Sequence, residues 1–301
     1  MAWLDMSMEK KMKKNKALSG HLMALACILI WGFAASFTKI LTNNLPNGTV
    51  QIVRSLMCSG FLCILNHESI KLSFKEELLY IGCGFFGKAL YQIFELNAYS
   101  RIPASIASVL ISTSPVMIGI LSMLIYKEKL SKWFIPGFIV SIAGICMISI
   151  TGVANLNADP VGLLFAILVA VTYAIQTMII RKILALPINV TASTRRITFW
   201  GIVFTIPIML ATHESFDFTG ILTLENVIAF LYVGLLSSAG TALLWNFSIT
   251  ILGAVKTSIY IYAIPVVAVI ASMIILHETI TPVILAGIAI TIVGVILSGK
   301  K

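Results

Sequence analysis

Long apolar runs, each bounded by polar or charged residues, follow one another along almost the whole chain. A transmembrane helix needs roughly 20 apolar residues to cross a hydrocarbon core of about 30 Å. Ten runs of about that length are present, at residues 20–41, 48–66, 77–99, 103–126, 132–151, 160–180, 190–211, 225–249, 254–276 and 281–298. The pattern predicts an all-α integral membrane protein with ten transmembrane helices and short connections.

The composition excludes a water-soluble globule of this length. Hydrophobic residues make up 59% of the 301 residues, charged residues make up only 11%, and the mean hydropathy is +1.01. A soluble surface needs far more charge, so lipid must be the solvent for most of the chain.

Basic residues gather at the helix ends on one side of the predicted bundle. The net charge of +9 does not form a groove-like patch, so we expect no nucleic acid partner. The N-terminal segment and alternate loops carry Lys10, Lys11, Lys13, Lys14, Lys16, Lys71, Lys75, Lys127, Lys129, Lys132, Arg181, Lys182, Lys256, Lys300 and Lys301. The opposite loops clearly hold only Arg101, so both termini are predicted to be cytoplasmic.

The basic segment 1–19 is followed by a run too long for the apolar core of a signal peptide, so we interpret the run as a retained first helix. The cysteines lie inside the spans without metal-ligand spacing and are interpreted as packing residues: Cys27, Cys58, Cys63, Cys83 and Cys146. We therefore expect no metal, no disulfide framework and no cofactor.

The chain repeats itself after 150 positions. The aligned pairs are Ala104 with Ala254, Ser108 with Ser258, Pro115 with Pro265, Glu128 with Glu278, Gly137 with Gly287 and Gly144 with Gly294. Agreement at helix-breaking, turn and small-residue positions together indicates duplicated structure, with one five-helix repeat at 20–151 and the second at 160–298.

An odd number of helices per copy places the second copy upside down in the membrane. The loop charges agree, because Lys127, Lys129 and Lys132 correspond to uncharged or weakly basic residues after the shift: His277, Thr279 and Pro282. Inverted repeats are typical of transporters, in which two related halves can exchange conformations around a central site.

The third span carries the most unusual polar residues. Lys88, Tyr91, Gln92 and Glu95 have a spacing that places them on one face of a helix. Ionisable residues in a membrane usually face a bundle interior or a wet cavity, so we expect this face to line a substrate cavity. The alternative is a tether from Lys88 to Glu95, or to a backbone carbonyl, that only fixes helix packing.

Other polar and aromatic residues extend the predicted cavity. The repeat places Ser238, Thr241 and Trp245 on Lys88, Tyr91 and Glu95. The further candidates are Trp31, Ser112, Tyr173 and Tyr262. Bulky packing is an equal alternative for Trp31 and Tyr173.

Pro115 and Pro265 are predicted to kink the fourth and ninth helices and to free carbonyl groups near Ile111 and Ile261. These helices could act as gates; the alternative is that nearby serines satisfy the freed carbonyls. Arg54, Arg195 and Arg196 are interpreted as snorkelling to lipid headgroups rather than binding anions.

The chain resembles the EamA-type permeases of the drug/metabolite transporter superfamily over nearly its whole length. The residues that carry the resemblance are Trp31-Gly32, Lys39, Arg54, Gly87, Ala89, Leu90, Tyr91, Asn97, Ala98, Ala104, Ala107, Pro115-Val116, Glu128, Gly137, Gly144, Gly234, Trp245, Gly253-Ala254, Pro265-Val266, Glu278, Gly287 and Gly294. The resemblance implies inverted five-helix repeats around a central cavity, a plasma-membrane location, and movement of small metabolites, often export of amino acids or related compounds. Lys88 and Glu95 depart from the general pattern, in which this face is more often aromatic or neutral.

We therefore expect a secondary transporter that works by alternating access, with a small molecule as substrate, protons as candidate coupling ion, and the lipid bilayer around it. The alternatives are an ion-independent facilitator or exchanger, a channel, or a membrane sensor that does not transport. Nucleotide-binding and nucleophile motifs are absent from the sequence, so no enzymatic activity is expected. The sequence leaves substrate, direction and oligomeric state open.

Overall fold

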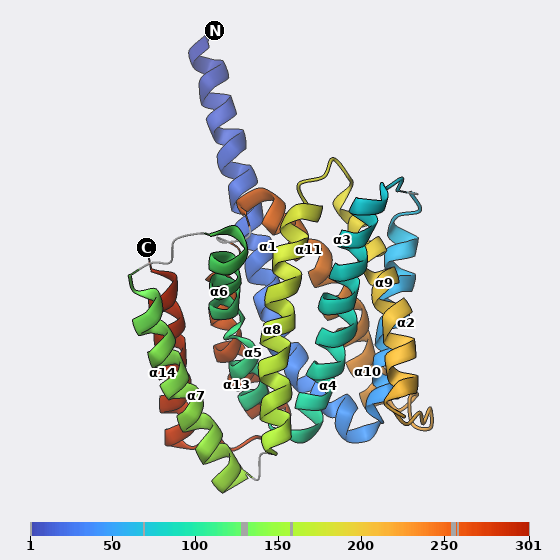
Figure 1. Ribbon diagram of the computed structural model, residues 1–301, viewed down its shortest axis with the longest axis vertical. Helices are drawn as coiled ribbons and strands as arrows, with labels where there is room; N and C mark the ends of the chain where they lie inside the picture. The colour runs from blue at the N-terminus through green and yellow to red at the C-terminus, as the bar shows by residue number, and fades with distance from the viewer. Residues whose placement is uncertain are drawn as a thin grey trace.

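The computed structural model describes residues 2–68, 70–127, 132–156, 159–253, 257 and 259–300, without the side chains of residues 2–16, 148–156, 259, 262, 295 and 299. Its elements are α1 (Ala2–Asn44), α2 (Asn47–Leu65), α3 (Phe74–Gly84), η1 (Phe85–Leu90), α4 (Tyr91–Arg101), α5 (Ala104–Ile111), α6 (Ser114–Tyr126), α7 (Phe134–Leu156), α8 (Pro160–Ile183), α9 (Val190–Ala211), α10 (Leu224–Phe230), η2 (Leu231–Gly240), α11 (Thr241–Leu252), η3 (Ile259–Ala263), α13 (Ile264–Ile275) and α14 (Pro282–Gly299). Figure 1 shows these helices side by side in one bundle.

Several elements continue directly into one another and form single spans. One span consists of α3, η1 and α4, and another of α10, η2 and α11. The span of α5 and α6 is interrupted between Ile111 and Ser114, whereas in the ninth span the 3-10 helix η3 continues directly into α13. Counted in this way, the described residues form ten spans, which confirms the predicted fold class.

The largest difference from the sequence prediction is the start of the first helix. We predicted a start near residue 20, whereas α1 begins at Ala2. The segment before Gly20 is rich in Lys, Met, Ala and Leu, which favour helix, and it contains neither Gly nor Pro. Propagating an existing helix is easy once it has nucleated, so α1 extends back through this basic segment.

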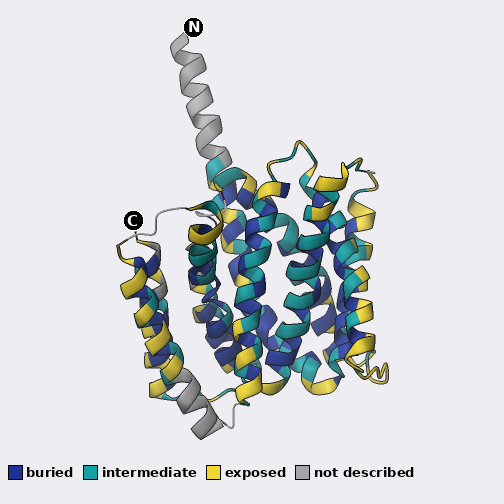
Figure 2. Ribbon diagram, in the orientation of Figure 1, coloured by how far each residue is buried: buried dark blue, intermediate teal, exposed yellow. Residues whose placement is uncertain are grey.

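The outer surface of the bundle is apolar. Within the described part of the chain, five helical stretches are long and apolar enough to cross a membrane: Ala17–Asn44, Asn47–Leu65, Ala104–Tyr126, Pro160–Ile183 and Leu224–Leu252. Large side chains along their outer faces are exposed, for example Leu18, Leu22, Leu25 and Leu29 of α1. Exposed residues follow the outer sides of α2 and α7 in Figure 2. A bilayer is the solvent that favours such a surface, so the chain is a multi-pass membrane protein.

The fifth and tenth spans show how the two halves are related. Ser141 Oγ of α7 donates a hydrogen bond to the carbonyl oxygen of Thr291 in α14 at 3.5 Å, and these two positions are repeat partners. On either side the contacts are reciprocal. A Cβ atom on Gly144 would lie 2.7 Å from the carbonyl oxygen of Gly287, and one on Gly294 would lie 2.7 Å from that of Gly137.

These contacts run in opposite directions along the two helices, since low numbers on α7 meet high numbers on α14. A two-fold axis through Ser141 and Thr291, perpendicular to the helices, therefore relates the halves. Such an axis lies in the membrane plane and produces inverted repeats. Figure 1 shows α7 and α14 together at one edge of the bundle.

We predict that Gly144→Leu destabilises the protein, because the added side chain meets the backbone of α14 at Thr291 and Gly287. Overpacking of this kind typically costs about 1–3 kcal/mol. Thermal unfolding in detergent, followed by tryptophan fluorescence, measures the loss. Gly60→Leu in α2 is the control, because nothing lies within 4 Å of a Cβ there. Equal melting temperatures for the two variants would contradict the proposed close approach.

Candidate functional site

A cavity of about 150 Å³ lies among the spans of both halves. One water molecule needs roughly 10–15 Å³ on this measure, so the cavity has room for a small molecule. Its lining includes Trp31, Arg54, Lys88, Tyr91, Gln92, Glu95, Ser112, Tyr173, Thr241 and Trp245. All the predicted cavity residues are brought together except Tyr262, whose side chain lies outside the described set.

The central part of the third span is a π-helix rather than an α-helix. Gly84 ends α3, and η1 then carries Lys88 before α4 begins at Tyr91. The eighth span has a π-helix at the repeat-related position, η2, which carries Ser238. A π-helical turn is wider than an α-helical turn and is frequent at functional sites. Both widened turns present polar residues to the cavity.

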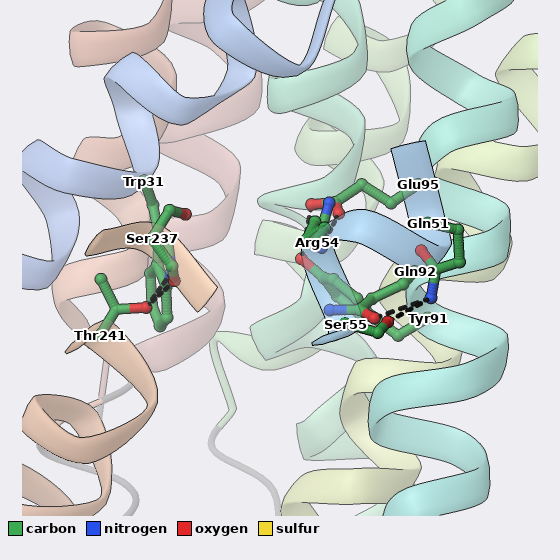
Figure 3. A network of polar contacts seen from close by, with 9 residues as sticks. All are labelled: Trp31, Gln51, Arg54, Ser55, Tyr91, Gln92, Glu95, Ser237 and Thr241. Carbon is green, nitrogen blue, oxygen red and sulfur yellow. Dashed lines mark hydrogen bonds and ion pairs between the residues drawn. The ribbon is translucent and has the colours of Figure 1, made fainter. Parts of the chain in front are cut away.

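Glu95 forms an ion pair with Arg54 of α2. The Arg54 Nη2 atom donates to Glu95 Oε2 at 2.6 Å, and the side chains are 6% and 14% exposed. Figure 3 shows the two side chains pointing toward one another. The sequence interpretation of Arg54 as a snorkelling residue is wrong, because its guanidinium group lies in the bundle interior.

The pairing partner of Glu95 also differs from the tether to Lys88 that the sequence left open as an alternative. Among the described residues Lys88 forms no ion pair with Glu95 or with any other acid. The physical reason is geometric, since Arg54 approaches Glu95 from the neighbouring helix, whereas Lys88 lies two turns away on the same span. Tyr91 Oη donates to the other carboxylate oxygen of Glu95 at 3.4 Å.

A second polar contact joins the same two spans. Gln51 Nε2 donates to Gln92 Oε1 at 2.9 Å, and Gln51 and Ser55 lie one turn apart on α2. Two buried polar atoms in this region have no hydrogen-bond partner among the described residues, the Nε atom of Arg54 and the Oε1 atom of Gln51. Buried polar groups are usually satisfied, so unsatisfied atoms beside a cavity are consistent with a wall that receives a polar ligand.

Aromatic side chains form the opposite wall. Trp31 Nε1 donates to Thr241 Oγ1 at 2.9 Å, and the Trp31 ring lies 4.8 Å from that of Trp245. A second aromatic contact joins Tyr173 and Tyr91, with ring centroids 6.1 Å apart. In Figure 3, Trp31, Ser237 and Thr241 lie apart from the Arg54–Glu95 group. The cavity therefore has one charged wall and one aromatic wall.

The fourth span is interrupted beside the cavity. It breaks after Ile111, and Pro115 lies in the first turn of α6. The hydroxyl group of Ser114 donates to the carbonyl oxygen of Ile111, which favours the alternative in which serine satisfies the freed carbonyl. Pro265 similarly lies in the first turn of α13, and Ile261 before it lines the cavity.

A cluster of polar contacts lies where α1 and α4 end. Lys39 Nζ donates to the carbonyl oxygen of Tyr99 at 2.6 Å. Glu278, from the loop after α13, accepts hydrogen bonds from the backbone N–H of Ala104 at 2.8 Å and from Ser105 Oγ at 2.6 Å. The carboxylate thereby caps the N-terminus of α5 from the other half of the protein. Tyr99, one of these residues, also lines the cavity.

Sequence reasoning missed the roles of Arg54, Gln51 and Glu278. A signal existed for the first two, because Gln51, Arg54 and Ser55 are spaced as one polar face within an apolar run. Glu278 contacts α5 across 174 positions of sequence, which no local pattern indicates. In the part of the chain that the structure describes, no group of three or more His, Cys, Asp or Glu residues could hold a metal ion.

Inverted helical repeats around a polar cavity are the architecture of a secondary transporter. Comparison with known proteins identifies the family. Residues 18–150 and 160–299 match the EamA-like transporter family, and the chain belongs to it. This membership indicates a transporter.

Individual relatives agree with this class. The chain is 25% identical over 293 residues to the uncharacterized transporter YetK of Bacillus subtilis, covering 95% of this chain and 88% of that protein. It is 27% identical over 222 residues to a probable terminal-alkyne amino-acid exporter of Streptantibioticus cattleyicolor, covering 73% and 72%. A crystal structure at 17% identity has the same fold, with a TM-score of 0.63 over 93% of this chain and 96% of the other.

We predict that Arg54 and Glu95 are energetically coupled. Removing one member of a buried pair leaves the other uncompensated, so Arg54→Gln and Glu95→Gln should each lower stability, and the double variant should lose less than the sum. Thermal unfolding of the four proteins in detergent gives the coupling free energy, expected at about 0.5–3 kcal/mol. Additive losses would show that the contact contributes nothing to the folded state.

Proposed function

We propose that the protein exports amino acids or closely related compounds by alternating access, in exchange for protons. The observation that carries this proposal is the Arg54–Glu95 ion pair in the wall of a central cavity. Charged side chains inside a membrane protein are expensive and usually functional. This pair presents both a positive and a negative group to whatever enters.

A zwitterion is the charge complement of such a pair. The α-carboxylate of an amino acid fits the guanidinium group of Arg54, whose Nε donor is free, and the α-ammonium fits the carboxylate of Glu95. Insertion of the ligand would replace one intramolecular pair by two pairs with the ligand. The wall of Trp31, Trp245 and Tyr173 is then available for the apolar part of the substrate.

Competition at Glu95 supplies a mechanism for coupling. A proton and a substrate ammonium both require the same carboxylate, so binding of one disfavours binding of the other. Exclusion of this kind produces exchange, in which an inward proton movement drives outward substrate movement. The similarity to a probable terminal-alkyne amino-acid exporter supports the direction and the substrate class.

The repeats provide the conformational change. Two halves related by an axis in the membrane plane can exchange conformations and so open the cavity to either face. The fourth and ninth spans are suited to rearrangement. The fourth is interrupted beside the cavity, and in the ninth a 3-10 helix continues into an α-helix there. Lys39 and Glu278 would close the face on which α1 ends, through their contacts with Tyr99 and α5.

The orientation follows from the distribution of charge. Positive residues in short loops remain in the cytoplasm, which places both termini there and the Lys39–Glu278 cluster on the outside. We propose the cell membrane as the location. An ion-independent facilitator is the main alternative, and a flux that ignores an imposed pH gradient would favour it.

We predict that Glu95→Gln loses proton-driven transport while remaining folded. The amide oxygen can still accept from Arg54, but the amide cannot carry the proton or pair with an ammonium group. Uptake of radiolabelled amino acids into proteoliposomes, with and without a pH gradient, should fall about tenfold or more, as expected for loss of a charge-assisted contact.

Glu225→Gln is the matched control. Glu225 is an exposed carboxylate in the first turn of α10, and its one side-chain hydrogen bond among the described residues is accepted from Asn44. Wild-type transport by Glu95→Gln would remove this carboxylate from the mechanism.

We also predict that Glu278→Gln opens the outer face. In a background without native cysteines, Thr38→Cys places a thiol in the cavity next to Lys39. Loss of the charge-assisted cap should raise its labelling by a membrane-impermeant thiol reagent applied outside, by about tenfold. Glu76→Gln is the control, since Glu76 caps only its own helix through Ser73.

An unchanged labelling rate would show that Glu278 does not hold this face closed. Faster labelling only from the cytoplasmic side would contradict the proposed orientation.

A further inference from the structure

The charges that line the cavity do not balance. Among the described residues that line it, Arg54 and Lys88 are positive and Glu95 is negative, which leaves one positive charge. Glu95 is already paired with Arg54. The other two ion pairs among the described residues lie elsewhere and join Glu77 with Arg196 and Asp159 with Arg101.

Lys88 is held in place by close packing rather than by a counter-charge. A Cβ atom on Gly201 of α9 would lie 2.5 Å from the Cβ atom of Lys88, so only glycine leaves room for the lysine stem. Gly84 permits the same close approach one turn earlier, with the backbone N of Gly201 only 2.8 Å from a Cβ there. The stem is therefore fixed between η1 and α9, and the side chain reaches the cavity.

An ammonium group without a carboxylate partner is unfavourable inside a membrane protein. The repeat shows that the position itself does not demand a charge, because the equivalent residue in the second half is Ser238. Lys88 is nevertheless a cation, and packing fixes its side-chain stem. A negative group that arrives with the ligand explains why this position carries a positive charge.

We propose that Lys88 binds a second acidic group of the substrate, so that the transported molecule is an amino acid with a carboxylate or similar acid in its side chain and a net charge of −1. The inference rests on the proposed function, in which Arg54 and Glu95 bind the zwitterionic head. Lys88 and Glu95 are seven residues apart, about 10 Å along the span. Their side chains can therefore hold the two ends of one small molecule.

The test compares ligands that differ by one charge but hardly in shape: glutamate with glutamine, and aspartate with asparagine. Binding to the purified full-length protein is followed by the fluorescence of Trp31 and Trp245, which line the cavity. The wild type should bind each acid about tenfold more tightly than its amide, the selectivity expected for one charge-assisted contact. In Lys88→Gln the ratio should fall to about one, while binding of the amides is retained.

Lys75→Gln is the matched control, since Lys75 is exposed at the start of the same span; it should keep the wild-type ratio. The wild-type ratio alone also tests the inference if Lys88→Gln does not fold. Binding of amides with no preference for acids overturns the inference and leaves the proposed function standing. Amide binding that requires chloride would assign Lys88 an inorganic counterion and also overturn it. Failure of every amino acid to bind overturns both.

Discussion

The absence of water from the bilayer core is the constraint on which the structure depends. Backbone and side-chain polar groups must find partners inside the protein, because lipid offers none. Leu18, Leu22 and Leu25 consequently face outward from α1, whereas Arg54, Gln92 and Ser108 are buried. The result is a bundle with an apolar surface and a polar interior. At the central cavity, polar side chains of that interior are accessible to a ligand.

The interior is built from two copies of one five-helix repeat. The reciprocal contacts of Gly144 with Gly287 and of Gly294 with Gly137 show that a two-fold axis relates the two copies closely. The π-helices η1 and η2 also lie at related positions. Symmetry of this kind supplies two conformations of equal architecture, which is the physical basis for access from either side of a membrane.

The fold was largely predictable from the sequence, because the thickness of the bilayer sets the length of the apolar run that a spanning helix needs. The stripe of Lys88, Tyr91, Gln92 and Glu95 was predictable for a similar reason, since helical periodicity is local. The pairing of Arg54 with Glu95 was not, because it depends on how α2 packs against α4. The start of α1 was also missed, since hydropathy marks where lipid begins and not where a helix begins.

The positions at which the two repeats differ determine how a ligand is oriented in the cavity. A strictly two-fold cavity would bind a ligand equally in two orientations. Glu95 corresponds to Trp245 and Lys88 to Ser238, so one half of the cavity is charged where the other is aromatic or hydroxylic. A ligand with a charged head and a distinct tail then has one preferred orientation. In the proposed mechanism the carboxylate of the charged half exchanges a proton for an ammonium group. The feature that orients the substrate would then also couple its movement to an ion gradient.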